Sequence, residues 1–160
     1  DPTVIVRLKE DHDGAEPSAN SVAILNLLRL DALVGFTGAR DRALKAIAAL
    51  RPQWSAIPHS LPQLLGAFEL ALDAPRTVVL AGERDTPAFR ALAATLDEQL
   101  GPRRSVLWVD GGVGQHWLAT RRPYLAEMKP VNGQPTAYLC ENFACQAPVT
   151  DPAALRQLLA

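Results

Sequence analysis

Apolar residues recur at intervals of three and four positions through the first 72 residues, the spacing of helices that bury one face. The spacing predicts helices over residues 17–34, 40–50 and 60–72. Pro17 near the start of the first helix and Gly35 just beyond its end are typical helix boundaries, and Pro52 marks the end of the second. The first helix is apolar on several faces, so we expect it to be buried on more than one side in the intact protein.

The pattern changes near Pro75. Short runs rich in β-branched residues predict strands over residues 77–81, 105–109 and 136–140, and helical spacing predicts helices over 86–100 and from 151 onwards. The order strand, helix, strand is typical of a parallel crossover. We therefore predict a mixed α+β and α/β fold, with helical hairpins in residues 1–74 and a small, mainly parallel α/β layer in residues 75–160.

Composition narrows the class of protein. Of the 160 residues 48% are apolar, which is enough for a core, and the formal net charge of −1 provides no basic face for nucleic acid. No apolar run has the length of about 18 residues that a membrane span needs. Two cysteines do not form a disulfide scaffold, so a reducing cytoplasm is the expected location. The chain starts at Asp1 without a methionine, which indicates a segment of a longer protein.

A polar stretch over residues 9–21 is the first candidate site. It contains four carboxylates, one histidine, two serines and one asparagine at the start of a predicted helix. Such residues cap helices, because their side chains accept hydrogen bonds from free backbone N–H groups. The same groups suit an anion or a hydroxyl-rich ligand, and two separated carboxylates can divide acid and base roles. Capping and ligand binding therefore both remain open.

Cys140 and Cys145 are separated by four residues and form the second candidate. A thioredoxin-like couple has two intervening residues, and a closed zinc site needs four ligands, which the sequence does not supply. Two structural thiols are the favoured interpretation, with a redox pair and a metal site as alternatives. Residues 111–114 are rich in glycine but lack the dinucleotide-binding order, so we predict a plain turn there.

Two long motifs resemble one known family. The stretch DGAEPSANS at residues 13–21 is similar to its D-G-A-x-P-S-x-N-S motif, and AYLCENFACQAPVTD at residues 137–151 is similar to its last strand and loop. On these motifs the chain resembles the YyaL-type, spermatogenesis-associated group of thioredoxin-domain-containing proteins. The order of the predicted elements between the motifs also fits, so the resemblance covers nearly the whole chain.

The resemblance implies an architecture. Such proteins have an N-terminal thioredoxin-like domain, an (α/α)-toroid similar to N-acylglucosamine 2-epimerases and six-hairpin sugar-active enzymes, and a C-terminal region. Residues 1–74 would then be terminal helices of the toroid and residues 75–160 a small α/β domain. The missing thioredoxin-like domain and the rest of the toroid would be the partners of this segment.

The resemblance also implies a ligand. Helix N-termini in such toroids face a central funnel, so a sugar-like small molecule is expected to bind there. Five residues carry over from the motif as ligand-binding candidates: Asp13, Glu16, Ser18, Asn20 and Ser21. No catalytic residue, cofactor or metal is predicted, and the isolated segment is expected to be inactive. The alternatives are a non-catalytic cap or interaction module, and a thiol redox or metal module built on Cys140 and Cys145.

Overall fold

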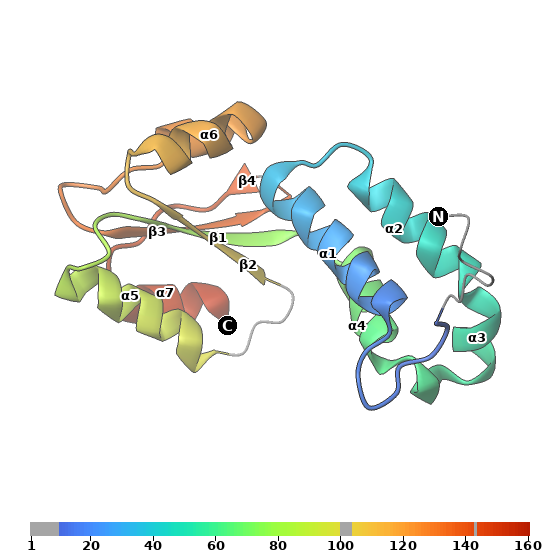
Figure 1. The fold of residues 1–160 in the computed structure, drawn as a ribbon. Coiled ribbons are helices and arrows are strands. Elements are labelled where there is room, and N and C mark those ends of the chain that lie inside the picture. Colours follow the sequence, from blue (N-terminus) through green and yellow to red (C-terminus); the bar gives the residue numbers. More distant parts are fainter. Residues whose placement is uncertain (1–9, 100–103, 143) are drawn as a thin grey trace. The chain divides into compact units, whose positions relative to one another are not determined.

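The computed structural model describes residues 10–99, 104–142 and 144–160. The chain divides into two compact units, one containing residues up to 31 together with 36–73, the other containing 32–35 and 74–160. The first unit is built from helices: α1 (Ala19–Val34), α2 (Ala39–Ala49), α3 (Arg51–Ala56), the 3-10 helix η1 (Pro58–Ser60) and α4 (Pro62–Leu72) (Figure 1). None of the helices in the described residues is long and apolar enough to cross a bilayer.

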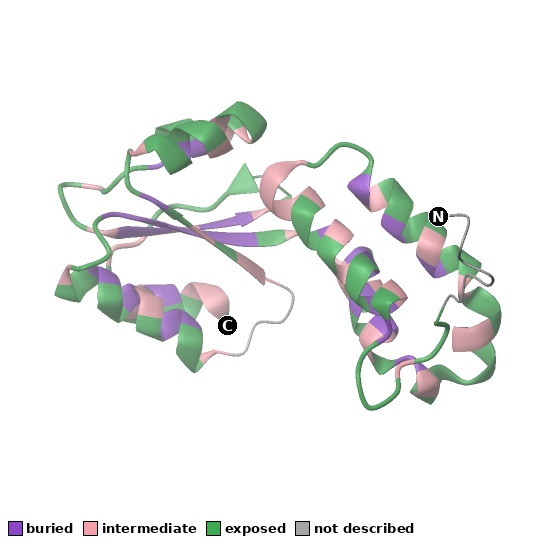
Figure 2. Cartoon of the chain, viewed as in Figure 1, coloured by how far each residue is buried: buried purple, intermediate pink, exposed green. Residues whose placement is uncertain are grey.

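The first unit has one core. Ile24 and Leu28 of α1 pack with Ile47 of α2 and with Leu64 of α4. In this chain α1 buries one stripe, whereas its residues Val22 and Leu30 are 39% and 43% exposed. Figure 2 shows buried residues along α1, α2 and α4 among intermediate and exposed ones, whereas α3 has no buried residue. Burial of α1 on more than one side was expected for the intact protein and stays a prediction.

The second helix ends as predicted, at Ala49 with Leu50 as its C-cap, but a helix that the sequence analysis does not predict follows it. Pro52 lies in the first turn of this helix, α3, which begins directly after the C-cap of α2. Proline is tolerated there because the first-turn N–H groups have no partner within the helix. Residues of α3 and η1 line a pocket together with residues of the polar loop.

The second unit contains a four-stranded sheet and its helices. The strands are β1 (Arg76–Ala81), β2 (Arg104–Val109), β3 (Thr136–Glu141) and β4 (Ala144–Cys145), in the order β2-β1-β3-β4. The helices are α5 (Pro87–Glu98), α6 (Val113–Arg121), the 3-10 helix η2 (Pro123–Glu127) and α7 (Pro152–Leu159). Figure 1 shows α5 and α7 on one side of the sheet and α6 on the other.

Strand β1 is central and buried on both faces, as its apolar run predicts. Val78 and Leu80 pack on α5 and α7, whereas Val79 and Ala81 pack towards α6 and η2. Two layers of core therefore lie on the two sides of one sheet. The predicted starts of α5 and α7 are confirmed, because Thr86 accepts a hydrogen bond from Phe89 N and Asp151 accepts one from Ala154 N. The predicted end of the α5 helix at residue 100 lies outside the described residues.

The expectation of a mainly parallel sheet is wrong. Only β1 and β2 are parallel, and they are joined by the predicted crossover through α5; β3 runs antiparallel to both β1 and β4. The chain reverses just before β3, where Asn132 and Gly133 have φ angles of 51° and 72° and Val131 pairs with Gln134 across the turn. Asn-Gly favours such tight reversals because both residues tolerate positive φ. The fold is therefore a mixed α/β fold with one parallel strand pair.

The plain turn expected over residues 111–114 is also corrected. Gly112 is the N-cap of α6 and the helix already begins at Val113. Gly111, with φ of 81°, provides the tight bend that leads from β2 into this helix.

Candidate functional site

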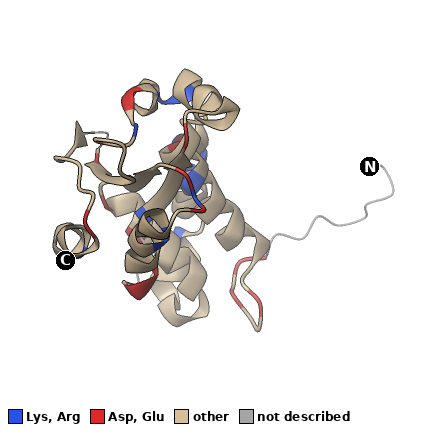
Figure 3. Ribbon diagram, turned by 90° about the vertical axis from the view of Figure 1, so that its left-hand side faces the viewer, with Lys and Arg blue, Asp and Glu red and all other residues tan. Residues whose placement is uncertain are grey.

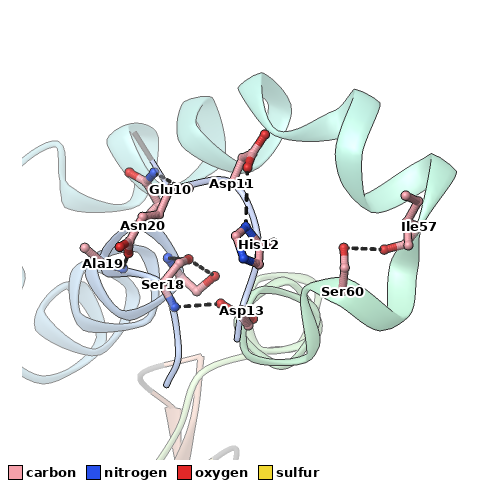
Figure 4. Close-up of polar contacts among 10 residues, drawn as sticks. Glu10, Asp11, His12, Asp13, Ser18, Ala19, Asn20, Ile57 and Ser60 are labelled. Carbon is pink, nitrogen blue, oxygen red and sulfur yellow. Dashed lines mark hydrogen bonds and ion pairs between the residues drawn. The ribbon is translucent and has the colours of Figure 1, made fainter. Parts of the chain in front are cut away.

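Asp13 holds the polar loop of the first unit against two helix starts. Its Oδ1 accepts the Ser18 N–H at 2.9 Å, and its Oδ2 accepts the Gln63 and Leu64 N–H groups of α4 at 2.8 and 3.3 Å. Its own N–H donates to Ser60 O at 2.7 Å. Figure 4 shows Asp13 directed towards Ser18. One carboxylate therefore supplies acceptors to the first turns of both α1 and α4, which otherwise leave backbone donors unpaired.

These contacts determine the ionisation of Asp13. Partial burial acts to raise the pKa of the carboxyl, but hydrogen bonds from the Ser18 and Gln63 amides and from the Ser21 and Ser18 hydroxyls outweigh it. The pKa of Asp13 consequently lies below its ordinary value of 3.8. The side chain is a carboxylate at neutral pH, and its oxygens are engaged with the protein.

Ser18 and Ser21 form the buried start of α1, with exposed fractions of 2% and 0%. The Ser18 Oγ accepts the Ser21 N–H at 3.2 Å, a capping contact, and donates to the Ser21 Oγ at 2.9 Å. The buried hydroxyls therefore satisfy each other and the helix terminus.

Asn20 lies in the first turn of α1, and Glu16 lies in the loop before it. Asn20 Nδ2 donates to Glu10 O at 2.6 Å, and Glu10 Oε2 accepts the Ala19 N–H at 3.3 Å. Glu16 is exposed. Figure 3 shows acidic residues gathered along this loop. Of the five residues that the motif indicates, Asp13, Ser18 and Ser21 are thus brought together by capping contacts, whereas Asn20 contacts Glu10 and Glu16 is exposed. Their role as ligand contacts stays a prediction.

A pocket of about 500 Å³ lies beside these contacts, between the loop and the α3–η1 segment. Asp11 and His12 lie on the loop side, where His12 Nδ1 is 3.7 Å from Asp11 Oδ1. On the other side Ser60 Oγ donates to Ile57 O at 2.8 Å (Figure 4). The lining consists of Asp11, His12, Pro52, Gln53, Ala56, Ile57 and Ser60.

Sequence reasoning missed the far wall of this pocket. Gln53 lies between the helices predicted over 40–50 and 60–72, and Ser60 lies at the predicted start of the latter; both are separated from the loop by about forty positions. Proline at the first turn of a helix was the available signal for α3, because Arg51-Pro52 followed by Gln-Trp-Ser-Ala is compatible with a new helix. The hydrogen bond from the Asp13 N–H to the Ser60 carbonyl cannot be predicted from a single sequence, because it joins segments that are far apart in the chain.

Cys140 and Cys145 form a disulfide between directly paired residues of β3 and β4, with Cα atoms 3.9 Å apart. Cys140 is buried at 1% exposure, whereas Cys145 is exposed on the short edge strand. This arrangement differs from the favoured expectation of two structural thiols, because the hairpin through Asn142, with φ of 49°, returns the chain directly onto Cys140. Phe143, expected to contribute to an apolar setting, lies outside the described residues.

Within the described residues no group of three or more His, Cys, Asp or Glu side chains is close enough to hold a metal ion.

The sequence of the chain is similar to those of several curated proteins. Human spermatogenesis-associated protein 20 is 35% identical to this chain over 154 residues, which is 96% of the chain. The chain is homologous to a portion of spermatogenesis-associated protein 20. The rat protein of the same name is 34% identical over the same share, and an uncharacterised protein of Caenorhabditis elegans is 28% identical over 93% of the chain. No family model and no solved structure matches the chain.

The homology covers only part of each relative. The chain spans about a fifth of the length of spermatogenesis-associated protein 20 and of the nematode protein. The resemblance stated from the two motifs is confirmed to this extent. The names of these relatives describe no reaction and no ligand.

Proposed function

We propose that the first unit binds a carbohydrate-type ligand in the pocket between the polar loop and the α3–η1 segment. The supporting observation is the composition of this pocket: Asp11, His12 and Ser60 provide hydrogen-bonding groups beside Pro52, Ala56 and Ile57. Sugars need both kinds of surface, because they present hydroxyls along their edges and C–H groups on their faces. Concave sites with an apolar lining and a few placed polar groups are the usual form of small-molecule sites.

Asp13 acts in this proposal as a positioning residue. It fixes the backbone of the loop against Ser60 and the start of α4, so that the neighbouring His12 faces the α3–η1 wall. Glu16, exposed in the loop, and Asn20, in the first turn of α1, do not line this pocket and would contact only a ligand larger than one sugar ring. The unit would form terminal helices of an (α/α)-toroid in the longer cytoplasmic protein, with the remaining toroid and a thioredoxin-like domain as its partners.

The test is a titration of the chain with neutral monosaccharides, including an N-acylated amino sugar, observed by NMR. His12→Ala and Ser60→Ala should weaken binding roughly tenfold each, because each removes a hydrogen bond of about 1.4 kcal/mol. The matched controls are His59→Ala and Ser55→Ala, which change exposed residues of the same segment that do not line the pocket. Equal loss in the controls, or no binding by the parent chain or the longer protein, contradicts the proposal.

A second candidate function is thiol–disulfide exchange, favoured by the exposure of Cys145 at one end of the disulfide. One thiolate of a dithiol reductant would attack Cys145 Sγ, form a mixed disulfide and release Cys140 as a thiolate. The second thiolate of the reductant would then displace Cys145. The protein gains two electrons and two protons, and the reductant becomes a disulfide.

Thiol counting tests this second candidate. The chain has no other cysteine, so intact mass after alkylation reports the pair directly. The oxidised chain should contain no free thiol, and dithiothreitol under native conditions should release two together; Cys145→Ser should leave one. A disulfide that is reduced only after unfolding, or two free thiols without any reductant, contradicts the proposal.

A further inference from the structure

A second pocket, of about 680 Å³, lies in the second unit, and none of its lining belongs to the polar loop or the cysteine pair. It is formed by the end of β2, one side of α6 and the segment that follows η2. Its polar groups are Asp110, Gln115, His116, Thr120 and Lys129. The volume is within the range of about 300–1,000 Å³ for small-molecule sites.

The position of the pocket in the sheet is the first argument. The parallel strands β1 and β2 lie side by side, yet the helices that follow them cover opposite faces: α5 packs on Val78 and Leu80, and α6 on the face of Val79 and Ala81 (Figure 1). Ligands of open α/β sheets bind outside the carboxyl ends of the strands. Val109, Asp110 and Gly111 at the carboxyl end of β2 line the pocket.

The Gln115 side chain connects the segments that form the pocket. It is 7% exposed, and its Oε1 accepts the Gly111 N–H at 2.6 Å. Its Nε2 donates to Leu125 O at 2.7 Å and to Met128 O at 2.8 Å. One buried amide therefore ties the loop after β2, helix α6 and the end of η2 together, which are the three segments that line the pocket.

The protonation of His116 is the next argument. Its Nδ1 lies 2.8 Å from Gly112 O, and a carbonyl oxygen only accepts hydrogen bonds. Nδ1 must therefore carry the hydrogen, and in the neutral ring the lone pair is on Nε2. Asp110, whose Oδ1 accepts the Gly112 N–H at 2.8 Å, adds carboxylate acceptors to the same pocket. Among the ion pairs of the described residues, none joins Asp110 to Lys129.

We propose that this pocket binds a small acid that also carries hydrogen-bond donors, such as a hydroxy or amino carboxylate or a phosphate ester with a free hydroxyl. The Lys129 ammonium pairs with the acid group of the ligand. Nε2 of His116 and the carboxylate of Asp110 accept hydrogen bonds from its hydroxyl or amine. The pocket thus offers one cation, Lys129, and two acceptors, His116 and Asp110. These groups suit a ligand with an acid group and a hydrogen-bond donor, but not a purely apolar or purely cationic molecule.

The test is a titration of the chain with glycolate, glycine and glycerol phosphate as probes, with acetate and inorganic phosphate as acids that lack the alcohol or amine group. NMR signals of His116 and Gln115 should shift, and glycolate or glycerol phosphate should bind more tightly than acetate or inorganic phosphate. The comparison between glycolate and glycerol phosphate distinguishes a carboxylate from a phosphate ligand. Binding of none of the probes, or equal binding of acetate and glycolate, overturns the proposal.

Matched variants locate the binding. Lys129→Ala should weaken it roughly ten- to a hundredfold, the loss expected for a charge-assisted contact, whereas Lys45→Ala, an exposed lysine of α2, should leave it unchanged. His116→Leu should weaken the preference for probes with a donor, because Asp110 stays as an acceptor, and should leave acetate binding in place; His59→Leu serves as its control. Equal effects of the two lysine variants would place the acid elsewhere and overturn the assignment.

Discussion

Each unit uses one polar side chain to hold a pocket, but the two side chains differ in charge. Asp13 in the first unit accepts hydrogen bonds from two helix starts and is partly exposed. Gln115 in the second unit is buried and neutral, and both donates and accepts. A carboxylate holds its segments only while ionised, whereas an amide holds them at any pH. The contacts that hold the loop of the first unit therefore depend on pH, whereas those of Gln115 in the second unit do not.

The largest expected effect on the free energy of unfolding comes from the hydrophobic core of the first unit. It should exceed the effects of removing the hydrogen bonds of Asp13 or of Gln115. Leu28→Ala, at a residue 4% exposed in the core of the first unit, should lower the free energy of unfolding by about 2–5 kcal/mol. Leu30→Ala on the same helix, where the side chain is 43% exposed, should change it by less than about 0.5 kcal/mol. Chemical denaturation measures both. Equal losses in the isolated chain would show that α1 has another packed face.

The hydrogen bonds of the neutral Gln115 side chain should have the next largest effect on stability. Gln115→Leu leaves the Gly111 N–H and the Leu125 and Met128 carbonyls without their partner, and should cost about 1–3 kcal/mol. Gln146→Leu, at an exposed residue of the same unit, is the matched control and should cost less than about 0.5 kcal/mol. The loss at Gln115 should be the same at neutral and at acidic pH. A loss of stability at only one of the two pH values would mean that a titrating group takes part in the hydrogen bonds of Gln115.

The stability contributed by the hydrogen bonds of the charged Asp13 side chain should depend on pH. Because the pKa of Asp13 in the folded chain lies below its ordinary value of 3.8, its contribution is complete above that value and is lost as the pH falls through the folded pKa. Asp13→Asn should cost about 0.5–2 kcal/mol near neutral pH, as lost caps do, and the difference from the parent chain should shrink in acid. Denaturation curves across this range measure it; a difference that grows on acidification contradicts the assignment.

The smallest effect concerns the exposed ion pair between Arg156 of α7 and Glu98 of α5, whose closest atoms are 2.6 Å apart. Both side chains are about half exposed, so Arg156→Ala should cost no more than about 1 kcal/mol, and less at high salt. Thermal unfolding at low and high salt measures this contribution. A salt-independent loss above that size would show that Arg156 acts through packing rather than charge.

The sequence predicts most elements because their signals are local. The β-branched run before Gly82 predicts β1, and Thr86-Pro87 and Asp151-Pro152 predict the starts of α5 and α7. The direction of β3 was predicted wrongly, since an apolar run does not state which way a strand runs. Asn132-Gly133, a strong local signal for a reversal, was the residue pair that could have corrected it.

The candidate sites are less predictable because they are assembled from distant segments. Asp13 was recognised as polar and motif-bearing, but its contacts with Gln63 and Leu64 span fifty positions. Gln115 carries no motif at all, and its role depends on carbonyls of η2 that only the fold brings near. The cysteine pair was recognised, whereas its pairing depends on the two-residue strand β4, which is too short to leave a periodic pattern.

The three histidines allow the central claim, that the two units hold separate pockets of different chemistry, to be tested in one measurement. His12 lines the pocket of the first unit, His116 that of the second, and His59 lines neither. The imidazole NMR signals of the chain are followed while a neutral monosaccharide and then glycolate are added. The account predicts that the sugar shifts the His12 signal, that glycolate shifts the His116 signal, and that His59 stays unchanged. A sugar that shifts His116, a glycolate that shifts His12, or a titration that shifts none of the three signals contradicts it.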